Sequence, residues 1–255
     1  MKILYRKLIL MAVVLLVVTL PGRAQMQGMA APKGSMVKAM NKLYGDITGF
    51  TARAERQVAT PMGPMTMVST MSMLDGKLRE ETDLADVKSA MLPKEMIEQL
   101  KKAGMNKSVQ IVRPDKNVIY VISPGSKSYL EMAFAKSTGK EEKEVTMEKS
   151  ELGKEKIEGH DCTRNKVVLT DDEGTKHEMT VWNAPDLKNF PIKSEAKEQG
   201  ATVTSVFKDV KLVKPDAKQF DVPADFTKYT DPMQYQMATM QAMQKAATEG
   251  AAPGK

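Results

Sequence analysis

The amino-acid sequence predicts a mainly β protein with a few helices (α+β), built on an antiparallel sheet that is curved or partly closed. Three observations predict this class. Apolar and polar residues alternate with a period of two over most of the chain. Short turn signals separate these alternating segments, which favours antiparallel pairing. Helical spacing is confined to segments near the start, in the middle and at the end.

The chain begins with the pattern of a secretory signal peptide. Lys2, Arg6 and Lys7 form a basic start, residues 8–20 are apolar and uncharged, and small residues precede a cleavage position after Ala24. The apolar run of 13 residues is too short to span about 30 Å of hydrocarbon. We therefore expect cleavage after Ala24, no membrane span in the mature chain, and a place in the bacterial periplasm or outside the cell.

Charge gives no support for a nucleic-acid partner. The 255 residues include 38 Lys+Arg and 32 Asp+Glu, a formal net charge of +6. The signal peptide holds four of the basic residues and no acid, so the mature chain carries 34 − 32 = +2. The single Cys excludes an intramolecular disulfide and a cysteine-based zinc cluster.

Composition divides the chain into five expected segments. They are a signal peptide (1–24), a flexible stretch of small residues (25–35), one folded domain (36–229), a Met-rich C-terminal helix (230–247) and a flexible tail (248–255).

The elements of the expected domain follow from periodicity and turn residues. Helical spacing predicts a helix over 36–44, ended by Gly45, and Pro93 divides two helical pieces within 84–105. The charged stretch 136–158 predicts a solvated connector or an exposed strand edge. Nine or ten strands are expected, including segments 50–57, 65–74, 77–82, 109–112, 118–122, 127–132, 161–169, 176–182, 190–197 and 202–213.

Several short patterns in this order resemble a known family. They are Gly-Lys-Glu-Lys-Ile-Glu-Gly-His-Asp-Cys at 153–162, Val-Trp-Asn-Ala-Pro-Asp-Leu at 181–187, Phe-Pro at 190–191 and Phe-Asp-Val-Pro-Ala-Asp-Phe at 220–226. Together they resemble the exported bacterial family called domain of unknown function 4412, which is similar in fold to the LolA/LolB lipoprotein carriers. The resemblance covers nearly all of residues 36–229.

The resemblance implies a curved, unclosed antiparallel half-barrel with helices covering its concave face and an apolar cavity between them. It brings no catalytic residues. We expect a non-catalytic protein without a cofactor.

Methionine is the compositional oddity, with 19 residues remaining after the signal peptide. Met65, Met67, Met71 and Met73 share one face of a predicted strand. Three interpretations stay open: ordinary core residues, the lining of an adaptable pocket for a lipid-like ligand, or soft thioether ligands for Cu(I).

Phe50 and Arg56 complete the candidate ligand-binding set of Phe50, Met65, Met67, Met71, Met73 and Arg56. Arg56 shares the alternating face of Phe50, where an apolar residue is expected. It anchors a ligand head group, pairs with a carbonyl of a lid, or reaches water near the strand end.

The C-terminal segment has Met233, Met237, Met240 and Met243 near helical spacing. This pattern predicts a helix that packs as a lid or docks on an envelope protein partner.

Enzyme motifs are weak. His160 and Cys162 lie two residues apart on a predicted strand, but a lone Cys is usually a small buried hydrophobic residue. His177-Glu178 lacks the second His of a zinc protease, and residues 125–128 lack the glycine spacing of a phosphate loop. The family resemblance and the methionine pattern together favour a periplasmic binding protein for an apolar or amphipathic ligand. The alternatives are a copper-handling protein and a structural or protein-interaction module.

Overall fold

The computed structural model describes residues 32–60, 63–89, 93–135, 145–172, 174–198 and 201–249. The predicted signal peptide, Pro61 and Met62, and residues 250–255 lie outside these ranges. The described residues form one sheet of thirteen strands with three α-helices and four 3-10 turns. None of these helices is long and apolar enough to cross a membrane.

The elements follow the chain in this order. The strands are β1 (Gly49–Thr60), β2 (Gly63–Leu74), β3 (Lys77–Asp83), β4 (Lys88–Ser89), β5 (Lys107–Arg113), β6 (Val118–Ser123), β7 (Ser128–Ala133), β8 (Thr146–Ile157), β9 (His160–Thr170), β10 (Lys176–Ala184), β11 (Phe190–Glu198), β12 (Ala201–Lys211) and β13 (Thr227–Tyr229). The helices are α1 (Gly34–Asn41), α2 (Lys94–Lys102) and α3 (Pro232–Glu249), and the 3-10 turns are η2 (Lys42–Tyr44), η3 (Leu84–Asp86), η4 (Pro185–Leu187) and η5 (Ala217–Phe220).

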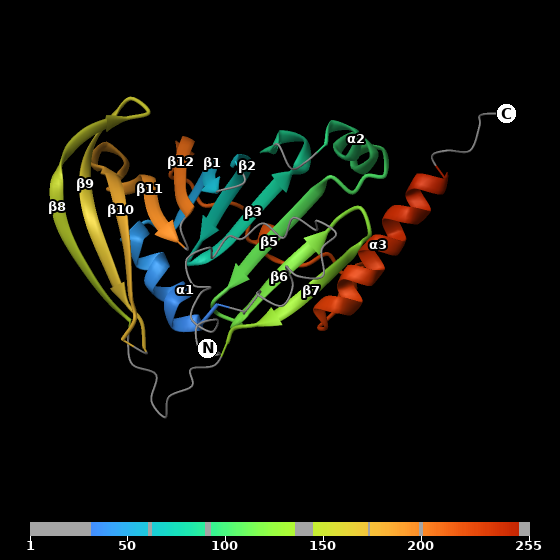
Figure 1. The fold of residues 1–255 in the computed structure, drawn as a ribbon. Helices are drawn as coiled ribbons and strands as arrows, with labels where there is room; N and C mark the ends of the chain where they lie inside the picture. The colour runs from blue at the N-terminus through green and yellow to red at the C-terminus, as the bar shows by residue number, and fades with distance from the viewer. Residues whose placement is uncertain are drawn as a thin grey trace, which may run out of the picture.

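The sheet is antiparallel and open. Its order is β13-β7-β6-β5-β3-β2-β1-β12-β11-β10-β9-β8, with β4 paired to β2, and within the described residues only β13 and β7 run parallel. The strands between β7 and β8 curve around α1, and the order ends at β13 and β8 without closure (Figure 1). This confirms the predicted α+β class and the curved, unclosed half-barrel.

Helix α1 defines the inner face of the sheet, which is the face against which it packs. Met36, Val37 and Ala39 of α1 are buried. Val37 joins a cluster with Phe50 of β1, while Met36 and Ala39 join a second cluster with residues of β9 and β10. One short helix therefore contacts β1 as well as β9 and β10, near the other end of the sheet order, as the resemblance implied for a helix on the concave face.

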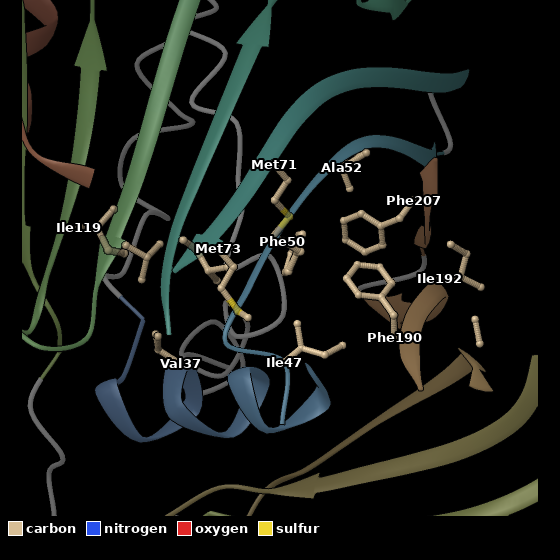
Figure 2. Close-up of a cluster of buried hydrophobic side chains, with 14 of the residues drawn as sticks. Val37, Ile47, Phe50, Ala52, Met71, Met73, Ile119, Phe190, Ile192 and Phe207 are labelled. Atoms are coloured by element: carbon tan, nitrogen blue, oxygen red, sulfur yellow. The ribbon is translucent and has the colours of Figure 1, made fainter. Parts of the chain in front are cut away.

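Aromatic rings fill the inner face beside α1. Phe50 and Phe190 meet edge to face with their ring centroids 4.9 Å apart. The ring centroid of Phe207 lies 5.3 Å from that of Phe190. Tyr44, just after α1, lies 5.1 Å from Phe50. Figure 2 shows the three phenylalanines beside Met73, above α1. This end of the inner face is a packed core.

Helix α1 is also tied to the sheet by polar contacts at its two ends. The Lys33 ammonium lies 2.8 Å from Asp172 in the β9–β10 turn, and both side chains are largely buried. Asn41 Nδ2 donates to the Gly76 carbonyl in the β2–β3 turn at 2.8 Å.

Helices α2 and α3 cover the other end of the β2 and β3 strands. Leu100 of α2 packs in a cluster with Met67 and Leu84, and Met243 of α3 packs against the same cluster. Tyr235 anchors the start of α3, 5% exposed, with its ring 6.0 Å from that of Tyr229. The predicted C-terminal helix thus packs onto the domain.

The opposite, outer face of β5 and β6 is covered by the segment that follows β12. Phe220 is fully buried there against Ile111 and Tyr120. Arg113 secures the segment by donating to the Phe220 carbonyl at 2.9 Å and to Asp221 at 2.7 Å.

One predicted element is wrong and one alternative is settled. The helical piece expected between Leu84 and Pro93 is the short turn η3 followed by the two-residue strand β4, where residues are described. Leu84 and Val87 belong to this irregular segment, and both side chains are buried in the cluster with Leu100 of α2, which is why their spacing resembles that of a helix.

Within the charged stretch 136–158, residues 146–157 form the edge strand β8, and residues 136–144 lie outside the described ranges.

Candidate functional site

Cross-strand pairing aligns residues of neighbouring strands in rows across the inner face. Phe50 pairs with Met73, and Ala52 pairs with Met71, nearest to α1. Because side chains alternate along a strand, every second residue of β1 continues this face, through Ala54 and Arg56 to Val58. Burial falls in the same direction, from Phe50, which is fully buried, to Val58, which is half-buried.

The last of these rows is apolar, and its side chains are half-buried. We call it the Val58 row: Met65 of β2, Val58 of β1, Val203 of β12 and Ala196 of β11 are paired in succession. With about 4.8 Å between neighbouring strands, the row is about 14 Å long. Its side chains keep some contact with solvent, and Val58 and Met65 also pack against the cluster beneath α2.

A buried polar group lies between the Val58 row and the aromatic core. Arg56 Nη1 donates to Glu80 Oε1 at 3.2 Å, and Ser69 Oγ donates to the same oxygen at 2.6 Å. The Arg56 and Glu80 side chains are 15% and 6% exposed. Three adjacent strands, β1, β2 and β3, supply these three residues, so the sheet itself fixes their positions.

The second carboxylate oxygen of Glu80 has no hydrogen-bond partner among the described residues, although it is buried. A buried acceptor without a partner costs about 1–3 kcal/mol, more for a charged group. Most buried polar atoms in folded proteins are satisfied by protein or water. Glu80 Oε2 is therefore a buried acceptor whose hydrogen-bonding capacity is unused among the described residues.

Tyr44 belongs to the same electrostatic environment. Burial raises the pKa of its hydroxyl well above the usual range. The positive charge of Arg56 opposes this rise in pKa, and the negative charge of Glu80 adds to it. We call Tyr44, Arg56, Ser69 and Glu80 the Glu80 group.

All six residues of the predicted ligand-binding set lie on the inner face. Phe50, Met71 and Met73 are buried in the core cluster beside α1, and Met67 is buried in the cluster beneath α2. Met65 is half-buried in the Val58 row. Arg56 is held in the ion pair with Glu80. Its role in ligand binding stays a prediction.

Sequence reasoning did not identify Glu80 or Ser69. The available signal was the alternation of β3, which puts Leu78, Glu80 and Thr82 on one face. A carboxylate on the face of a buried leucine requires a partner, but the partner lies 24 residues away, on a strand that is not adjacent in the sheet.

The Cys–His pair does not form a nucleophilic site. Cys162 is 1% exposed, and burial raises the pKa of its thiol. Its sulfur contacts the backbone oxygen of His160, whereas the ring Nδ1 of His160 lies 2.6 Å from Asp186. The described residues contain no cluster of three or more His, Cys, Asp or Glu side chains that could hold a metal ion.

The outward face of α3 carries three exposed methionines. Met233, Met237 and Met240 are 68%, 54% and 44% exposed and follow one another at intervals of four and three residues. Side chains at these intervals lie on the same helix face. The envelope partner predicted for this helix stays a prediction.

Comparison with solved structures gives matches of low sequence identity. A putative outer membrane lipoprotein-sorting protein domain from Vibrio parahaemolyticus is 11% identical, with a TM-score of 0.36 and coverage of 74% of this chain and 96% of that one. Lipoprotein LppX from Mycobacterium tuberculosis is 10% identical (TM-score 0.37, coverage 74% and 98%). A LolA superfamily protein from Nitrosomonas europaea is 12% identical (TM-score 0.33, coverage 72% and 95%). No protein with a curated description matches the chain.

The fold defines a class of protein in which one open, curved antiparallel sheet wraps a short helix. Within that class, a family model described as domain of unknown function (DUF4412) matches residues 62–190. The chain belongs to this family, and the resemblance read from its sequence is confirmed.

Proposed function

We propose that this protein is an exported, non-catalytic binding protein for an amphipathic small molecule with an aliphatic chain. The observation that carries the proposal is the Val58 row, a line of half-buried apolar side chains beside a buried polar group. An aliphatic chain lying on this row removes apolar surface from water, at about 25 cal/mol per Å². The periplasm is the proposed location, on the signal-peptide pattern of residues 1–24.

The geometry favours an amphiphile over a purely apolar ligand. Arg56 and Val58 lie two residues apart on the same face, which is about 7 Å along an extended strand. An aliphatic chain on the row therefore lies about two residues from Arg56, whereas Glu80, opposite Met71, lies further along the strands toward the core. The row length of about 14 Å suits a chain of medium length.

The test is saturable binding of the fluorescent probe 1-N-phenylnaphthylamine to the mature protein, followed by displacement with 1-decanol. We expect one probe per protein. The Val58→Asp variant places a carboxylate in the row and should weaken probe binding at least tenfold. Gln57→Asp is the matched control, because Gln57 is the exposed neighbour on the opposite face of β1. Equal affinity in both variants, or no saturable binding, contradicts the proposal.

A second candidate, soft-metal binding, is favoured by the exposed thioethers of α3. Cβ atoms three or four residues apart on a helix are about 5–6 Å from each other, so two flexible Met side chains can converge on one cation. Thioethers select Cu(I) among biological metals. The β2 thioethers are mostly buried in the core clusters, which makes them less accessible to an entering ion.

Titration with Cu(I) against a chromogenic chelator tests this candidate. Changing Met233, Met237 and Met240 together to Leu should abolish binding, since Leu keeps the apolar character and removes sulfur. The matched variant changes Met65, Met67, Met71 and Met73 to Leu. Loss of binding in that variant alone would move the site to β2, and no binding by the unaltered protein would remove the candidate.

A further inference from the structure

We propose that the ligand of the inner face carries a neutral hydroxyl head group, which donates a hydrogen bond to Glu80 Oε2. This inference rests on the proposed function and specifies the chemistry of its ligand. The observation behind it is the buried oxygen of Glu80 that has no partner among the described residues.

The occupied oxygen of the same carboxylate sets the direction of the missing bond. Glu80 Oε1 already accepts from Ser69 and Arg56. An ionised carboxylate only accepts hydrogen bonds, so the open position at Oε2 calls for a donor. A ligand that brings only acceptors, such as an ether or an ester, leaves this oxygen unsatisfied.

Charge balance then selects a neutral donor. The positive charge of Arg56 and the negative charge of Glu80 cancel within the Glu80 group, and both side chains are largely buried. An added ammonium or carboxylate head group would leave a net charge in this environment, and uncompensated buried charge is strongly unfavourable. A hydroxyl supplies the donor without changing the net charge.

Position supports the same assignment. Glu80 is directly opposite Met71 in the β2–β3 pairing, and Met71 is directly opposite Ala52 of β1, so Glu80 is on the inner face. Arg56, its ion-pair partner, is two residues from Val58 along β1. A hydroxyl bound at Oε2 therefore lies on the core side of Arg56, and the aliphatic chain of the same ligand extends from it past Arg56 toward the Val58 row.

The experiment compares four ligands with the same ten-carbon chain in displacement of 1-N-phenylnaphthylamine. They are 1-decanol, 1-methoxydecane, decanoate and decylammonium. We expect 1-decanol to bind at least tenfold more tightly than 1-methoxydecane, which has no donor, and more tightly than either charged ligand. Equal affinity of 1-decanol and 1-methoxydecane would overturn the inference, as would preference for decanoate or decylammonium.

The Glu80→Gln variant tests the assignment to this oxygen. The Gln carbonyl can replace Oε1 in accepting from Ser69 and Arg56, which puts the amide NH₂ at the position of Oε2. Both 1-decanol and 1-methoxydecane accept from that NH₂, so their affinities should become equal within about twofold. Persistence of the tenfold preference in Glu80→Gln would overturn the assignment.

A second variant controls for a folding defect, and binding of the probe itself distinguishes failure of the head-group inference from failure of the proposed function. Glu55→Gln alters a β1 carboxylate on the opposite face, paired with Lys208, and should keep the preference for 1-decanol. If the probe itself does not bind the unaltered protein, the proposed function fails. If the probe binds and the four ligands displace it without the expected order, only the head-group inference fails.

Discussion

The side chains of the inner face form an apolar core and, beside it, a buried polar group. Phe50 and Phe190 are fully buried and contact each other edge to face, an arrangement that adds to the stability gained from burial alone. Beside them the sheet buries the oppositely charged pair of Arg56 and Glu80. The effect of such a pair on the free energy of unfolding depends on both charges being present, because removing one leaves the other buried without a partner.

Removing only the cation of this pair should be costly. In Arg56→Met the Glu80 carboxylate stays buried without its positive partner. We expect the free energy of unfolding to fall by about 3 kcal/mol at pH 7 in urea denaturation. The double variant Arg56→Met, Glu80→Leu removes both charges and should recover most of the loss. A double variant less stable than the single one would contradict this account of the pair.

A second residue-scale prediction concerns pH. The hydrogen bond from Arg113 is the main cause that lowers the pKa of Asp115 in the folded state. A lowered folded-state pKa stabilises the protein fully above the ordinary value of about 3.9, and this stabilisation is lost as pH falls through the folded-state value.

The Asp115→Asn variant lacks this contribution. The stability difference between the unaltered protein and Asp115→Asn should be constant above about pH 5 and shrink as pH falls below about 4. Urea midpoints measured from pH 7 to pH 2 check it. A difference that grows toward low pH would have the wrong sign.

At the scale of elements, helix α3 illustrates how position on a helix decides what a side chain contributes. Tyr235 is 5% exposed and packs against Tyr229, whereas Met237, half a turn further, is 54% exposed. The two residues belong to the same helix and Ala preserves helicity at both. They form a matched pair for measuring how firmly α3 is attached.

We expect Tyr235→Ala to lower the free energy of unfolding by about 3 kcal/mol, the usual cost of truncating a buried aromatic side chain. Met237→Ala should change it by less than about 0.5 kcal/mol, as exposed substitutions generally do. Similar values for the two variants in urea denaturation would show that α3 is not anchored through Tyr235.

Element by element, period and turn residues predicted most strands because most strands bury at least one face. They failed between Leu84 and Pro93, where burial of Leu84 and Val87 comes from a single turn and imitates helical spacing. They did not decide between a connector and a strand for β8, because an edge strand with both faces largely exposed has little apolar periodicity. The charged side chains of β8 suit an edge, where they oppose pairing with another chain.

The candidate site was harder to predict than the fold. Alternation alone put Phe50 and Arg56 on one face of β1 and the four methionines on one face of β2. The Glu80 group needs the register of three strands, because Arg56 and Glu80 meet across β2. No local pattern in the sequence contains that register.

At the scale of the whole molecule, two arms of the sheet meet at the β1–β12 pair. Strands β1 to β7 and β13 form one arm and strands β8 to β12 the other, and α1 packs against both (Figure 1). The Val58 row crosses this junction, from β2 to β11. A ligand on the row would contact both arms, which places the proposed site at the centre of the fold.

The most direct test uses the methionines as reporters. Proteins labelled with ¹³C at the Met methyl groups are titrated with 1-decanol, and spectra of single Met→Leu variants assign the signals. The account predicts that the signal of Met65, in the Val58 row, shifts saturably, while those of Met233 and Met237 on the outward face of α3 stay in place. Shifts confined to the α3 methionines, or an unchanged Met65 signal at saturating 1-decanol, would contradict it.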